Sequence, residues 1–210
     1  MKKVLALALA LVLVLSLAAC GGLGKASKET VSLGKTVSTD IVDFTLKDAE
    51  FSYYASTLDE SYAEPLEKSD KHAMKVSKGR VFVCMTFDIK NNDRSTLNIG
   101  DSFADWKVDF KLTYKGKDYP LKAFDLNDKD GRELALNDAG LSSDGGKTWK
   151  WNGSGSYGTS NIILGAGRTL TVRLPALAIV EPDSLKDSFE ITVNIPNSSG
   201  KDEYYTYVVK

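Results

Sequence analysis

Histidine and cysteine are scarce in this sequence of 210 residues, and neither sign of charge is in clear excess. His72 is the only histidine, so a serine or cysteine nucleophile activated by imidazole would have to use it, and no Gly-x-Ser-x-Gly motif occurs. The 27 basic residues nearly balance the 28 acidic ones, whereas nucleic-acid-binding domains usually carry a basic surplus. We therefore expect no enzyme activity, no catalytic residue and no nucleic-acid partner.

The first nineteen residues have the three-part layout of a secretory signal peptide. Two lysines provide the positive start, an uncharged apolar run follows, and small residues precede the cleavage point. The uncharged stretch 4–19 is shorter than the about 20 residues of a membrane-spanning helix, which favours cleavage over a transmembrane anchor. Removal of residues 1–19 leaves 25 basic residues against 28 acidic ones, a formal charge of −3.

The residues Leu17-Ala18-Ala19-Cys20 resemble a bacterial lipobox, in which the cysteine is lipidated and becomes the new N-terminus. The resemblance implies a diacylglyceryl group on Cys20, and two acyl chains anchor a protein stably where one binds only marginally. Small and polar residues over 20–34 predict a flexible tether. We expect a protein anchored to the cell membrane and facing outside the cytoplasm. Cys84 then has no disulfide partner, and it is expected to be a small buried residue of its strand.

Apolar and polar residues alternate with period two from residue 36 onward, and sustained helical periodicity is rare. The cleanest alternation covers 106–114, and another covers 42–53 with a bulge expected at Asp48-Ala49. Seven to nine such strands predict an all-β fold, an antiparallel β-sandwich over residues 35–210. We expect one core to contain Val83, Phe87, Val108, Phe110, Val172 and Ile191.

Two segments depart from this strand rhythm. Residues 55–79 are polar and charged, and residues 126–160 are rich in Gly, Asn, Asp and Ser. Loops of that length are uncommon in compact domains and often carry function. We therefore predict two insertions in the sandwich and expect any working surface to lie in one of them.

Several short stretches give the chain a family resemblance. They are Leu33-Gly34-Lys35-Thr36-Val37, the core strand within 78–92, and Leu164-Gly165-Ala166-Gly167-Arg168-Thr169. Together they resemble a broad family of bacterial surface lipoproteins of unknown function, whose immunoglobulin-like domain is similar to that of a secreted mycobacterial immunogenic protein. The resemblance covers most of residues 33–210. It implies an immunoglobulin-like sandwich and no known enzyme activity, and we expect no cofactor.

The segment Ser142-Ser143-Asp144-Gly145-Gly146-Lys147-Thr148-Trp149 resembles the Asp-box of sialidases and other propeller proteins. Its physical content is a hairpin: the Asp accepts backbone hydrogen bonds, a Gly takes an unusual dihedral angle, and the Trp packs beneath. The box occurs once here, without propeller repeats. We interpret it as a stabilised hairpin inside the second insertion and not as evidence for glycoside hydrolysis.

Three aromatic residues, Trp149, Trp151 and Tyr157, cluster near this hairpin among glycines and serines. Rigid aromatic side chains are effective binding anchors because they lose little entropy on contact. The alternative is that they cover the end of the sandwich as a local core. Our leading hypothesis is a non-enzymatic surface module that binds an envelope protein or glycan through one of these rings, and burial of all three would reject it.

Two metal-binding patterns are weaker. His72-Ala73-Met74 together with Met85 offers the imidazole and thioether ligands that suit copper, but Met85 falls on the core face of its strand. The segment 125–131 hints at a calcium loop, yet it places Leu126 and Asn137 where that motif requires acidic ligands. We assign no metal ligand and keep a copper carrier as an alternative function.

Overall fold

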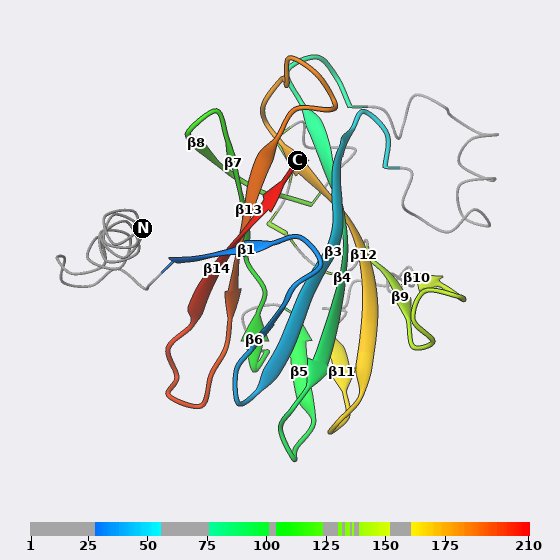
Figure 1. Ribbon diagram of the computed structural model, residues 1–210. Coiled ribbons are helices and arrows are strands. Elements are labelled where there is room, and N and C mark those ends of the chain that lie inside the picture. Colours follow the sequence, from blue (N-terminus) through cyan, green and yellow to red (C-terminus); the bar gives the residue numbers. More distant parts are fainter. Residues whose placement is uncertain are drawn as a thin grey trace, which may run out of the picture.

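The computed structural model of the chain is built from strands arranged in three sheets (Figure 1). No helix of the described part is long and apolar enough to cross a membrane. The predicted signal peptide, Cys20, His72, Met74 and Tyr157 lie outside the described residues. The structure describes residues 28–55, 76–100, 104–123, 130–131, 133–134, 136, 139–151 and 161–210.

The first sheet has five strands, and every neighbouring pair is antiparallel except β1 and β14, which run parallel. Its spatial order is β1 (Lys28–Ser32), β14 (Glu203–Val209), β13 (Phe189–Ile195), β7 (Phe110–Tyr114) and β8 (Lys117–Pro120).

The second sheet has six strands and is antiparallel throughout. Its order is β10 (Lys150–Trp151), β9 (Gly140–Ser142), β12 (Thr169–Ala178), β4 (Val81–Asn91), β3 (Val42–Ser52) and β2 (Thr36–Ser38). A third, small sheet contains β11 (Ile162–Leu164), β5 (Leu97–Gly100) and β6 (Trp106–Lys107).

The strand order of the two large sheets is that of an immunoglobulin-like domain. In chain order, β3, β4, β7, β8, β9, β12, β13 and β14 take the places of strands A, B, C, C′, D, E, F and G. Strands A, B, E and D then form one sheet, and C′, C, F and G form the other, as in that fold. The predicted immunoglobulin-like antiparallel sandwich is therefore confirmed.

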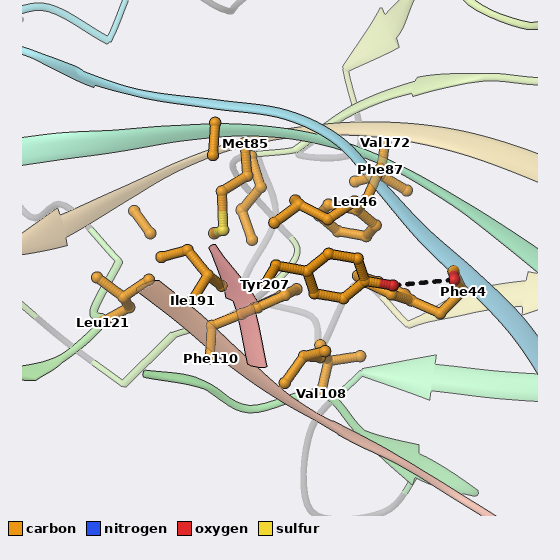
Figure 2. Close-up of a cluster of buried hydrophobic side chains, with 14 of the residues drawn as sticks. Phe44, Leu46, Met85, Phe87, Val108, Phe110, Leu121, Val172, Ile191 and Tyr207 are labelled. Atoms are coloured by element: carbon orange, nitrogen blue, oxygen red, sulfur yellow. Dashed lines mark hydrogen bonds between the residues drawn. The ribbon is translucent and has the colours of Figure 1, made fainter. Parts of the chain in front are cut away.

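Large apolar side chains from both sheets fill the space between them (Figure 2). The Phe44 ring from β3 lies 5.3 Å from Phe87 of β4 and 6.2 Å from Phe110 of β7, measured between centroids. The hydroxyl of Tyr207, a fully buried residue of β14, shares its one donor proton between the carbonyls of Lys35 (3.1 Å) and Phe44 (3.2 Å). The six residues expected to share one core do so, which confirms the assignment of the apolar faces: Val83, Phe87, Val108, Phe110, Val172 and Ile191.

The alternating segment 106–114 is buried on its predicted face but is not one continuous strand. It divides into β6 and β7, and Asn194 of β13 bonds to the backbone at the break. The side-chain nitrogen of Asn194 donates to the Lys107 carbonyl at 2.8 Å, and its side-chain oxygen accepts from the Asp109 N–H at 2.6 Å. The backbone carbonyl of Asn194 accepts from the Trp106 indole at 3.0 Å. These bonds satisfy backbone groups that a continuous strand would have paired with a neighbour.

Two predicted positions differ from the structure. β1 begins at Lys28, inside the predicted tether 20–34, because its backbone bonds to β14 and its Val31 side chain is buried. β9 and β10 form the hairpin that was expected inside the insertion 126–160, and the pairing of β9 with residues 171–173 of β12 adds this hairpin to the sheet. The β3 bulge lies between Leu46 and Asp48 and leaves Lys47 as the extra residue, one position before the predicted site.

Truncation of Phe110 tests the shared core. Phe110 is 1 % exposed, and Phe110→Ala is expected to lower the free energy of unfolding by about 3–5 kcal/mol, because burial is lost and a cavity remains. Urea denaturation of the full chain measures the change and should show a single transition. Glu190→Ala, on the outward face of β13, is the control and should change stability by less than about 0.5 kcal/mol. A similar effect for both variants would contradict the assigned core.

Candidate functional site

The β9–β10 hairpin is held by one carboxylate, that of Asp144. The Asp144 Oδ1 accepts from the Ser142 hydroxyl at 2.7 Å and from the backbone N–H groups of Lys147 (3.0 Å) and Thr148 (2.9 Å). Its Oδ2 accepts from the Thr148 hydroxyl at 2.7 Å. The Gly146 N–H donates to the Ser142 hydroxyl oxygen at 2.8 Å. The predicted Asp-box hairpin is therefore present, and it belongs to the edge of the sandwich.

These hydrogen bonds favour the ionised form of Asp144. The Ser142 hydroxyl makes the largest contribution, followed by the Thr148 amide and hydroxyl, and together they hold the Asp144 pKa far below its ordinary value. The turn also needs residues with a left-handed backbone, and Gly145 (φ 75°) and Gly146 (φ 95°) supply it. The hairpin is thus fixed by both electrostatics and backbone geometry.

The Trp149 indole packs beside this turn and is half-buried. A Cβ atom added to Gly140 would lie 3.4 Å from the indole, and one added to Gly146 would lie 3.3 Å from it, so both glycines leave room for the ring. The guanidinium carbon of Arg173, on β12, lies 4.1 Å from the centroid of the Trp149 ring. That distance is a cation–π contact, and it joins the hairpin to the sheet through side chains as well as backbone.

The three aromatic residues predicted to bind a ligand have different outcomes. Trp149 is placed and only partly covered. The backbone of Trp151 pairs with Gly140 in β10, and the side chain of Trp151 lies outside the described part. Tyr157 also lies outside the described residues. A ligand-binding role for these residues remains a prediction, with Trp149 as the member that the structure places at an accessible position.

Of the residues considered for copper binding, Met85 is the one that the structure describes. Met85 is fully buried in the core between the sheets, where its thioether is surrounded by apolar side chains, so the copper arrangement with His72 and Met74 loses this ligand. No group of three or more His, Cys, Asp and Glu side chains gathers within the described ranges. Cys84 is 4 % exposed and packs with Phe82 and Leu177, which confirms the expectation of a small buried residue.

Arg173 is the residue of this site that the sequence did not reveal. It occupies an ordinary polar position in the alternation of β12, and nothing nearby in the chain links it to the Asp-box. The link arises from the pairing of Arg173 with Gly140, which brings two segments more than thirty positions apart into neighbouring strands. Only a prediction that β9 and β12 (strands D and E) pair would have indicated the contact of Arg173 with Trp149.

Replacement of Asp144 tests the hairpin. Asp144→Ala is expected to remove the hydrogen-exchange protection of the Lys147 and Thr148 amides, because both donate to this carboxylate. In the wild type, a lowered folded-state pKa means that the stabilisation is complete above the ordinary carboxyl pKa of about 3.9 and is lost only as the pH falls through the lower folded value. Protection should therefore persist at about pH 4. Ser143→Ala, an exposed change in the same turn, should preserve it. Unchanged exchange in Asp144→Ala would show that the turn is held otherwise.

Comparison with known proteins gives structural matches at low identity. No family model and no curated protein matches the chain. An uncharacterised β-sandwich protein of Clostridium difficile is 16 % identical, with 91 % of this chain and 100 % of that chain covered and a TM-score of 0.49. The ycdA protein of Bacillus subtilis, a candidate lipoprotein, is 15 % identical over 86 % of this chain and 39 % of its own, with a TM-score of 0.43.

A third match, the yjhA protein of Bacillus subtilis, is 10 % identical over 84 % of this chain and 98 % of its own, with a TM-score of 0.40. None of these three proteins is the mycobacterial immunogenic protein, and the expected similarity to its domain remains a prediction. The assignment of the fold therefore rests on the strand order of this chain itself.

Proposed function

We propose that this protein is a lipid-anchored, extracytoplasmic binding module without catalytic activity. The observation that carries the proposal is the lipobox-like sequence Leu17-Ala18-Ala19-Cys20, which directly follows an apolar run and precedes a β-sandwich. Kinship with the family of immunoglobulin-like surface lipoproteins is part of the same proposal. The sequence has one histidine and no Gly-x-Ser-x-Gly motif, and both facts support the proposed lack of catalytic activity.

The start of β1 supports a domain held close to the membrane. Only seven residues separate Cys20 from Lys28, where β1 begins. At about 3.3–3.6 Å per residue, this connection reaches less than roughly 30 Å when fully extended. Lys28 pairs with Tyr204 at the beginning of β14, so the tether leaves the end of the sandwich that also carries the turn between β13 and β14. That end would face the membrane.

The β9–β10 hairpin is the surface that fits a binding role best. It lies at the edge of the second sheet, and Figure 1 shows it projecting away from the body of the sandwich. Its backbone is held by the Asp144 carboxylate, and Trp149 is partly accessible on it. A rigid aromatic ring on a fixed backbone binds a partner with little loss of entropy. We place the binding surface here, at Trp149 and its neighbours.

Cys20→Ser tests the anchor. The variant should incorporate no labelled palmitate and should lose the detergent-dependent release from membranes that a lipid anchor confers, because the sulfur that carries the lipid is absent. Cys84→Ala is the matched control: Cys84 is buried in the sandwich, and its replacement should leave labelling and membrane release unchanged. Equal palmitate labelling of the wild type and Cys20→Ser would reject the lipoprotein assignment.

A further inference from the structure

Arg173 has no anionic partner in the described part of the chain. Several surface cations of the described chain form ion pairs, such as Lys47 with Asp88 (3.3 Å) and Lys111 with Asp118 (2.6 Å). The Arg173 guanidinium makes no hydrogen bond or ion pair in the described structure, and its one side-chain interaction there is the stack on Trp149. A half-buried guanidinium without a carboxylate is a group with unused donors.

Two carboxylates of the adjoining strand and hairpin, Asp88 and Asp144, bond to groups other than this guanidinium. Arg173 lies in one row across the sheet between Gly140 and Thr86, neither of which is charged. Asp88, two positions along β4 from Thr86, accepts from the Thr171 hydroxyl at 2.7 Å and pairs with Lys47. Asp144, the acidic residue of the hairpin, is occupied by its own turn. Both acidic groups are therefore satisfied by other partners.

The contact with Trp149 also restricts where the guanidinium can lie. A guanidinium carries its five N–H donors in its own plane, so a ring beneath that plane leaves the donors free at the edge. The contact holds the guanidinium carbon 4.1 Å from the ring centroid, which reduces the entropy lost when a ligand binds. Carboxylate and phosphate groups match this fork, because two of their oxygens accept parallel N–H bonds. The arrangement thus has the chemistry of an oxyanion receptor.

We propose that the Trp149–Arg173 pair binds a carboxylate or phosphate group carried by an anionic polymer of the cell envelope. This inference rests on the proposed function, which puts the hairpin outside the cytoplasm, and it supplies the class of ligand. Arg173 forms the bidentate contact, and Trp149 holds it in place. Gly140 keeps the adjacent position free of a side chain that would displace the indole.

Calorimetric titration of the detergent-solubilised full chain tests the proposal. The probes are polyphosphate and polygalacturonate as anionic polymers, inorganic phosphate as the isolated group, and dextran as a neutral polymer. Wild-type protein should bind at least one anionic polymer, more tightly than inorganic phosphate, and should not bind dextran. Because charge-assisted hydrogen bonds are lost, Arg173→Ala should weaken binding about tenfold or more. Added salt should weaken it as well.

Three further variants separate this site from general charge attraction. Arg173→Lys keeps the charge but lacks the planar fork, so its affinity should fall close to that of Arg173→Ala. Trp149→Phe should give an intermediate loss. Arg94→Ala removes an exposed arginine of the turn after β4 and should bind like wild type. Equal binding by wild type and Arg173→Ala, equal losses in Arg94→Ala and Arg173→Ala, or no binding of either anionic polymer would overturn the proposal. None of these results would affect the palmitate labelling of Cys20, which tests the anchor separately.

Discussion

Packing of aromatic rings around Phe44 holds the three sheets of this domain together without a covalent cross-link between them. The Phe44 ring contacts Phe87, Trp106, Phe110 and Tyr207, with centroid distances between 5.3 and 6.3 Å. These rings come from five strands and all three sheets. In antibody domains a disulfide joins strands B and F across the same space. Cys84 is the one cysteine of the described chain and lies on the other face of strand B, so the aromatic cluster takes over that task.

The apolar faces of the strands were predictable because burial follows the two-residue period of a strand. Phe87, Phe110 and Ile191 were placed in one core from that pattern alone, and the structure agrees. The break in 106–114 could not be predicted this way, because the alternation continues through it. The cause is Asn194, more than eighty positions later, whose side chain bonds to the backbone on both sides of the break. Local periodicity carries no information about such a distant polar partner.

In the candidate site, too, the local contacts were predictable and the contacts between distant segments were not. The Asp144 turn was predictable because its bonds join residues within four positions of one another. The stack of Arg173 on Trp149 was not, because it depends on which strand lies beside β9. The short strands of the hairpin also lack a run long enough to show alternation, so their segment was predicted as an insertion. Contacts that depend on strand order cannot be predicted from local sequence patterns. The contact of Arg173 with Trp149 is one of them.

The parallel pairing of β1 with β14 has a mechanical consequence. Lys28, the first residue of β1, pairs with Tyr204 near the start of β14, so the two strands begin at the same end of the sheet. A pull directed outward from Lys28 along the strand axis would load all the hydrogen bonds between 28–32 and 204–208 together, in shear. An antiparallel hairpin pulled from its open end would instead lose its bonds one pair at a time. The domain would therefore resist force best in the direction along β1 and β14, which is the direction in which a membrane anchor before Lys28 would pull it.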